Sequence, residues 1–168
     1  MVNFANLAIQ IPSLLIPSDH VNLNRWSVIA CDQYTSDPGY WAEVRRRIGA
    51  APSTLDLILP EVYLHDPEVD MGIQRIKARM QTFLANKILV PLPPGLILIN
   101  RQTANVPSRK GLVLAIDLEQ YDYHKGAKSL IRPTEETIPE RLPPRIKIRA
   151  GGSLEVPHIM LLLDDPEH

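Results

Sequence analysis

Hydrophobic residues recur at spacings of three and four along one stretch of the chain, which is typical of an amphipathic helix. They are Val69, Ile73, Ile76, Met80 and Phe83. Asp66 followed by Pro67 provides a start for this helix, and the pattern ends near Asn86. We therefore expect a helix that packs against the core by this face.

A second helix is expected from Pro38 to about Arg47. Ser36 or Asp37 can cap its first turn, the proline suits the first helical position, and Gly49 stops the helix. Its apolar side is formed by Tyr40, Trp41, Val44 and Ile48.

Five further apolar runs have the length of β-strands. They are Trp26 to Cys31, Leu57 to Leu64, Leu96 to Arg101, Gly111 to Asp117 and Val156 to Leu163. The second contains Pro60, which cannot donate to a strand ladder, so it is an edge strand or an extended packing segment. The third and fourth are joined by a polar turn, Asn105 to Lys110, and are expected to form a hairpin. Together these elements predict an α/β or α+β fold, with a mixed sheet of about five strands and two to three flanking helices.

The 168 residues, of which 45% are hydrophobic and 22% charged, suffice for one ordinary domain with a core. We therefore expect residues 1–168 to form a single domain. The last expected strand is followed by only residues 164–168, and this abrupt end suggests the N-terminal part of a longer protein. A net charge of −1 argues against a nucleic-acid-binding arm.

Cys31 is the only cysteine, so the chain cannot form an internal disulfide, which favours a reducing, cytoplasmic setting. The apolar stretch from Leu7 to Ile16 is broken by Pro12 and followed directly by Pro17. This stretch is too short for a membrane span or a signal peptide. Neither a membrane nor a nucleic acid is expected as a partner, and the oligomeric state is not indicated by the sequence.

Potential chemistry is concentrated between Tyr121 and Arg149. The cations of this segment are Lys125, Lys128, Arg132, Arg141, Arg145, Lys147 and Arg149. The acids and hydroxyls among them are Glu135, Glu136, Glu140, Thr134 and Thr137. Fixed cations beside hydroxyl groups suit a small anionic ligand, above all one that carries a phosphate.

The part expected to face this ligand is residues 125–135. A glycine lets the backbone turn there, Lys125 and Lys128 bracket an anion position, and Arg132 adds a forked donor. Thr134 can open a helix whose free amide groups attract anions. The plainer interpretation is a solvated loop and a capped helix with ordinary ion pairs.

Three further charged residues admit two interpretations each. Arg141 and Arg145 can complete the cationic wall, or they can pair with Glu135 or Glu136 and only hold the segment in shape. Glu61 is an acid inside an apolar stretch. It is a base with a raised pKa or an edge-strand charge that faces water.

Cys31 and Asp32 lie where a predicted strand becomes a loop, a place where ligands gather in α/β sheets. Asp32 can bind a metal or a substrate amine, or simply close a turn. Cys31 can be a nucleophile only with a histidine base, and a buried small thiol is the plainer interpretation. His158 is interpreted as a core histidine. Asp164 and Asp165 follow a predicted strand and can hold a metal or form a turn.

The sequence lacks the common phosphate-loop, dinucleotide, hydrolase and zinc motifs, yet several longer segments resemble one family. They are A-C-D-Q-Y-T-S (Ala30 to Ser36), Y-W (Tyr40, Trp41), A-P-S-T-L-x-L-I-L-P-E-V-Y-L (Ala51 to Leu64), K-G-L-V-x-A-I-D-L-E-x-Y-D-Y (Lys110 to Tyr123), K-G-x-K-S-L-I-R-x-T-E (Lys125 to Glu135), E-R-x-P-P-R-x-K-I-R (Glu140 to Arg149) and P-H-I-M (Pro157 to Met160). Over nearly the whole chain, the sequence resembles the bacterial domain-of-unknown-function 1015 family.

Some relatives in that family are similar to free-serine kinases of the ParB and sulfiredoxin superfamily, which use a G-[HN]-H-[RS]-like motif for nucleotide phosphates. The resemblance implies ATP-dependent phosphorylation of a small hydroxy amino acid such as serine, with ATP and magnesium as cofactors. Lys125, Lys128 and Arg132 would hold phosphate, and Glu135 or Asp32 would orient the acceptor or a magnesium ion. The G-[HN]-H-[RS] motif is absent here and would fall beyond the last residue, so the chain would carry only part of the machinery.

Two other classes of function are open. The first is a non-catalytic module that binds a phosphorylated metabolite or a partner protein, and it should not need magnesium for ligand affinity. The second, nucleic-acid binding, is weaker because no basic patch interleaved with aromatic residues occurs.

Overall fold

The structure is a computed structural model that describes residues 8–122, 124–132, 137–156 and 158–162. The chain divides into two compact units. The first consists of Met1–Ile16 and Val90–Thr137, and the second of Pro17–Leu89 and Ile138–His168. Two compact units can make one domain or two, so the single domain stays a prediction. Among the described residues, no helix combines the length and the hydrophobicity needed to cross a bilayer.

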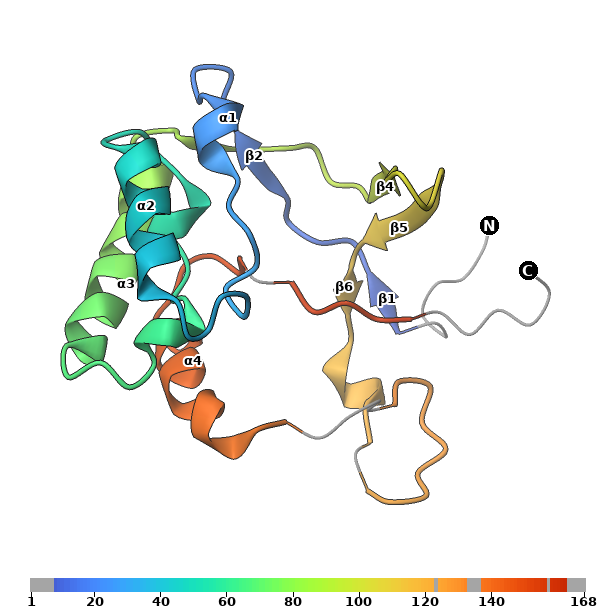
Figure 1. Cartoon of the computed structure of the whole chain (residues 1–168). Coiled ribbons are helices and arrows are strands. Elements are labelled where there is room, and N and C mark those ends of the chain that lie inside the picture. Colours follow the sequence, from blue (N-terminus) through green and yellow to red (C-terminus); the bar gives the residue numbers. More distant parts are fainter. Residues whose placement is uncertain (1–7, 123, 133–136, 157, 163–168) are drawn as a thin grey trace. The chain divides into compact units, whose positions relative to one another are not determined.

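The second unit contains the α-helices of the described chain (Figure 1). They are α1 (Leu23–Trp26), α2 (Pro38–Ile48), α3 (Val69–Ala85) and α4 (Leu142–Arg149), with short 3-10 helices at Thr54–Asp56, Glu61–Tyr63 and Pro139–Arg141. The predictions of α2 and α3 are confirmed. Asp37 caps α2 by accepting a hydrogen bond from the Tyr40 amide at 2.9 Å, and Pro38 occupies the first turn. Gly49 ends the helix with a φ of 62°, which favours glycine.

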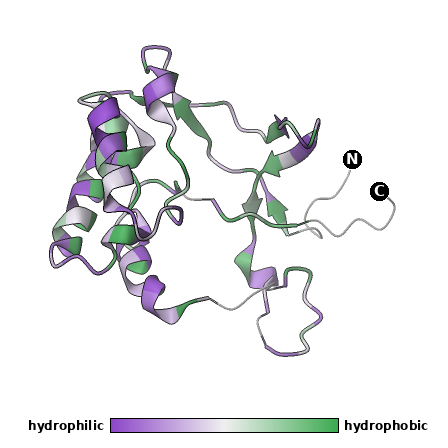
Figure 2. Ribbon diagram, viewed as in Figure 1, coloured by the Kyte–Doolittle hydropathy of each residue, from purple (hydrophilic) through white to green (hydrophobic). Residues whose placement is uncertain are grey.

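The core of the second unit is built on the apolar faces of α2 and α3. Ile73, Ile76, Met80 and Phe83 of α3 are buried, as their spacing predicts. A second buried cluster joins Trp41, Ile48, Leu55 and Ile58. Figure 2 shows hydrophobic and hydrophilic residues alternating along the ribbons of both helices. These helices are therefore stabilised mainly by burial of one face.

The first unit contains short two-stranded sheets. β4 (Ile97–Arg101) pairs antiparallel with β5 (Arg109–Val113), which confirms the predicted hairpin. In its register, Ile97 lies opposite Val113. β1 (Ile9–Gln10) pairs antiparallel with β6 (Ala115–Ile116), and a 3-10 helix follows at Leu118–Gln120. A third pair joins β2 (Leu15–Pro17) to β3 (Leu89–Pro91). The fold therefore mixes α and β structure, but the described strands form separate pairs and not one five-stranded sheet.

Three expected strands are absent from the described residues. Residues 27–31 are irregular, and Trp26 ends α1, where its carbonyl accepts hydrogen bonds from the hydroxyls of Ser53 and Thr54 at 2.9 and 2.8 Å. Residues 57–64 form a 3-10 helix and irregular backbone, and most of them are buried. The edge strand is therefore wrong, and the burial agrees with the alternative of a packing segment. Residues 158–162 are exposed and have no regular secondary structure. Apolar content alone does not distinguish a strand from these segments.

Two adjacent glycines at the end of α4 differ in the space around them. A Cβ on Gly152 would lie 2.8 Å from the Ile148 carbonyl oxygen and 3.3 Å from Met80 Sδ. A Cβ on Gly151 would meet only the end of the Lys77 side chain, at 2.8 Å from Nζ. At Gly152 the neighbouring atoms include backbone, which cannot move easily. At Gly151 the neighbour is the flexible end of the Lys77 side chain, which can change its rotamer.

We expect Gly152→Ala to lower the free energy of unfolding by about 1–3 kcal/mol, because backbone or core must shift to admit the methyl group. Gly151→Ala is the matched control and should stay within about 0.5 kcal/mol of the parent. Urea denaturation of both variants measures the difference. Equal stabilities would show that the turn after α4 is not closely packed on α3.

Candidate functional site

Glu61 is a buried acid held by two arginines in the second unit. Its side chain is only 3% exposed, and the start of α4 brings the cations to it. Arg141 Nη1 lies 2.9 Å from Glu61 Oε2, and Arg145 Nη2 donates to Glu61 Oε1. The spacing of four residues puts the two arginines on one side of the helical segment. Glu61 is therefore not the water-facing edge charge that one interpretation proposed.

The two arginines exceed the charge of the carboxylate that they hold. Their side chains are 40% and 39% exposed, so each guanidinium keeps a face toward solvent. The Arg141 contact has ion-pair distance without hydrogen-bond geometry, and Glu61 Oε2 has no hydrogen-bond partner among the described residues. Two cations around one anion leave a local excess of one positive charge. Arg141 and Arg145 thus support the fold and still present positive charge at the surface.

Cys31 and Asp32 adjoin this ion-pair cluster. The Glu61 amide donates to the Cys31 carbonyl at 2.8 Å. Burial raises the pKa of the Cys31 thiol, the Arg145 guanidinium opposes that rise, and the carboxylates of Asp32 and Glu61 add to it. A thiol with a raised pKa is a poor nucleophile at neutral pH. Asp32 is exposed and accepts a hydrogen bond from Gln33 Nε2 at 3.3 Å.

The loop that sequence analysis assigned to phosphate lies in the first unit. Gly126 has a φ of 84°, and the Ala127 amide donates to the His124 carbonyl at 3.0 Å, which makes a tight turn. The Ser129 hydroxyl donates to the Ile131 carbonyl at 2.6 Å, and Arg132 Nε donates to the Ser129 carbonyl at 3.2 Å. The backbone of the loop is thus held by its own polar groups.

The cations of this loop are exposed. Lys125 and Lys128 form no ion pair with any carboxylate that the structure describes, and neither does Arg132. The predicted partners Thr134 and Glu135 lie outside the described residues.

The structure therefore distributes the predicted site residues between two places. Lys125, Lys128 and Arg132 share a loop of the first unit, whereas Asp32, Arg141 and Arg145 belong to the second. The sequence signal for the loop was its local composition. The pairing of Arg141 and Arg145 with Glu61, about 80 residues away, gave no local signal.

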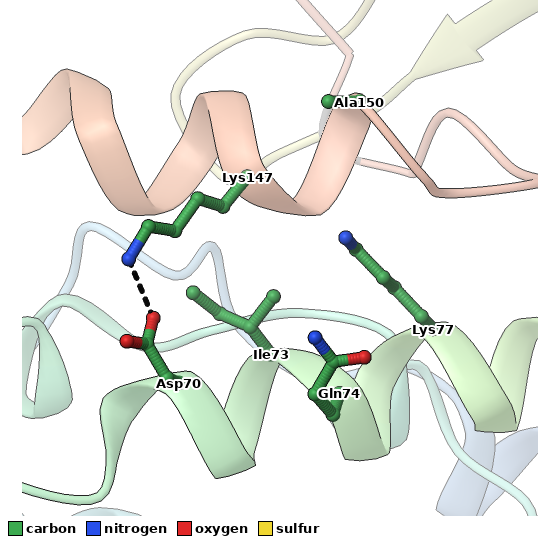
Figure 3. A pocket seen from close by; sticks show the side chains of 6 residues that line it. All are labelled: Asp70, Ile73, Gln74, Lys77, Lys147 and Ala150. Atoms are coloured by element: carbon green, nitrogen blue, oxygen red, sulfur yellow. Dashed lines mark hydrogen bonds and ion pairs between the residues drawn. The ribbon is translucent and has the colours of Figure 1, made fainter.

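A groove of about 410 Å³ separates α3 from α4. Figure 3 shows the Lys147 side chain reaching from α4 to Asp70 on α3, and the Lys77 side chain pointing toward α4. The Lys147–Asp70 contact is 2.6 Å long and neutralises both charges. We interpret this groove as a helix-packing seam with a surface ion pair.

A cleft that sequence analysis missed lies between α2 and α3 and has a volume of about 520 Å³. Its cations are Arg45, Arg75 and Arg79. The sequence does contain a hint of this cleft: Arg75 and Arg79 are four residues apart on α3 and therefore share a face of the helix.

The structure tests the prediction for His158 but not the one for Asp164 and Asp165. His158 is exposed, so the core-histidine interpretation is wrong. Asp164 and Asp165 lie outside the described residues. No group of three or more His, Cys, Asp or Glu side chains in the described chain is arranged to hold a metal ion.

Comparison with known families agrees with the resemblance noted in the sequence. A family model described as protein of unknown function (DUF1015) matches residues 15–168. The match covers most of the chain, so the chain belongs to this family. Neither a curated protein nor a solved structure matches it.

Proposed function

We propose that this member of the family binds the phosphate group of a small molecule through Lys125, Lys128 and Arg132. We further propose that it contributes this element to ATP-dependent phosphorylation of a small hydroxy amino acid such as serine. The observation that carries the proposal is the exposure of these three cations on one glycine-turned loop, with no carboxylate partner among the described residues.

Phosphoryl transfer suits such a loop, because the protein's main tasks are to position groups and to neutralise charge on the phosphate. Lysine ammonium groups act as point charges, and an arginine provides a forked donor for two phosphate oxygens. Magnesium is commonly held by one or two carboxylates together with the phosphates themselves. Glu135 or Asp32 is the carboxylate that we propose for that task; the first lies outside the described residues and the second belongs to the other unit.

The alternative is a binding module without catalysis, for a phosphorylated metabolite or a partner protein. The pairing of Arg141 and Arg145 with Glu61 favours this alternative. These two cations then stabilise the fold, in addition to any ligand that they bind. Such a module would bind the phosphate with the same loop but would not need magnesium.

Binding to the loop is tested by calorimetric titration of the whole chain with ATP and with phosphoserine, each with and without magnesium. Lys128→Ala and Arg132→Ala should each weaken binding by about tenfold, the value of one charge-assisted hydrogen bond. Lys110→Ala and Arg101→Ala are matched controls, because both are exposed cations elsewhere in the first unit. Equal losses in the variants and the controls would refute the loop as the site.

Catalysis is tested separately by incubating the whole chain with ATP, magnesium and serine and measuring phosphoserine. Product that disappears in Arg132→Ala would support the kinase. Phosphoserine binding that is equally tight with and without magnesium would instead favour the binding module.

A further inference from the structure

The lining of the cleft between α2 and α3 contains both charged and apolar side chains. Three arginines, Arg45, Arg75 and Arg79, stand against a single carboxylate, Asp56. Arg45 is paired with that carboxylate at 2.8 Å. The lining therefore carries an excess of two positive charges. Its volume of about 520 Å³ is that of a pocket for a small molecule.

Arg75 and Arg79 are exposed and form no ion pair within the described part of the chain. They lie one helical turn apart on α3, so both guanidinium groups can reach the same ligand. Guanidinium groups bind phosphate oxygens through two parallel hydrogen bonds. Two such forks on one helix face match a doubly charged anion.

Much of the rest of the lining is apolar, and part of it is buried. Trp41 is 1% exposed, and Leu55 and Ile58 belong to the same buried cluster. The indole N–H of Trp41 has no hydrogen-bond acceptor among the described residues.

We infer that this cleft binds a phosphate monoester whose organic part is apolar. The phosphate lies on Arg75 and Arg79, and the apolar part lies against Trp41 and the side chains beside it. Inorganic phosphate would lose the apolar contact, and a neutral alcohol would lose the charge. The site uses no residue of the loop 125–132, so it stands or falls independently of the function proposed above.

Trp41 provides a direct readout, because the chain has only two tryptophans. In a Trp26→Phe background, Trp41 is the sole tryptophan and its fluorescence reports on the cleft. Benzyl phosphate should change this fluorescence saturably, with half-saturation at or below about 1 mM. Arg75→Ala and Arg79→Ala should each weaken the binding by about tenfold. Inorganic phosphate and benzyl alcohol should each bind at least about tenfold more weakly than benzyl phosphate.

Lys77→Ala is the matched control, since Lys77 is a cation of the same helix that lines the other groove. It should leave the affinity for benzyl phosphate unchanged. The inference is overturned if benzyl phosphate gives no saturable change, if Lys77→Ala weakens binding as much as Arg75→Ala, or if inorganic phosphate binds equally well. Should Trp26→Phe fail to fold, because Trp26 packs on Phe83 at 5.9 Å, calorimetry on the unsubstituted protein decides between the same outcomes.

Discussion

Replacing Arg141 and Arg145 together with alanine should lower the free energy of unfolding by about 2–4 kcal/mol. The double variant leaves the Glu61 carboxylate, whose side chain is 3% exposed, without either of its cations. An unpaired buried charge is far more costly than a missing surface pair. The expected value lies somewhat below that of a fully buried pair because both arginines are partly exposed.

A rescue variant separates this electrostatic effect from loss of packing. Adding Glu61→Gln to the double variant removes the buried charge and should restore most of the lost stability in urea denaturation. A triple variant no more stable than the double variant would mean that the arginines act through their hydrocarbon stems and not through Glu61.

The chain offers a matched control at its surface, where another glutamate is paired with two arginines. Glu43 accepts hydrogen bonds from Arg46 and Arg47, whose side chains are 74% and 75% exposed. These hydrogen bonds lower the pKa of Glu43 to about 2, but all three groups are in contact with water. Arg46→Ala combined with Arg47→Ala should therefore shift the urea midpoint much less than the Arg141 and Arg145 pair.

Met80→Ala is expected to cost about 2–5 kcal/mol, because it removes a side chain from the centre of the core and leaves a cavity. Met80 is 1% exposed and lies on the buried face of α3 with Ile73 and Phe83. Met71→Ala on the same helix is the control, since Met71 is 55% exposed, and it should change stability by less than about 0.5 kcal/mol.

Chemical denaturation of both methionine variants measures this contrast. Large and similar losses of stability at both positions would mean that α3 is not packed by the face that the structure shows. A small loss of stability at Met80 as well as at Met71 would indicate that the core closes around the deleted side chain.

The helices α2 and α3 and the hairpin could be predicted because their signals are local. The i, i+3, i+4 spacing along α3, the Asp37 cap of α2 and the polar turn between β4 and β5 each lie within one element. Local pattern and final structure agree wherever the deciding contacts are made within about a dozen residues.

The wrong strand prediction for Trp26 to Cys31 has a physical cause. Trp26 gives its carbonyl to the hydroxyls of Ser53 and Thr54, so this backbone acceptor finds side-chain partners in place of a neighbouring strand. A run of apolar residues shows that a segment is buried, but not which distant group will accept or donate its hydrogen bonds.

The candidate sites show the same limit. The loop 125–132 could be found from its composition, whereas the pairing of Glu61 with Arg141 and Arg145 depends on how α4 packs beside α3. The α2–α3 cleft depends on a tertiary contact as well, because Arg45 and Arg75 come from different helices. Such groupings require the fold itself.

The order of synthesis determines when the Glu61 ion pairs can form during translation. Glu61 and Arg145 are 84 residues apart, and the whole segment Val90–Thr137 of the first unit is translated between them. At about 5–20 residues per second, the ribosome needs roughly 4–17 s to make that interval. Until this interval ends, α4 is incomplete and Glu61 lacks the arginines that hold it in the folded chain. The second unit can therefore close only after the unit inserted into it has already emerged.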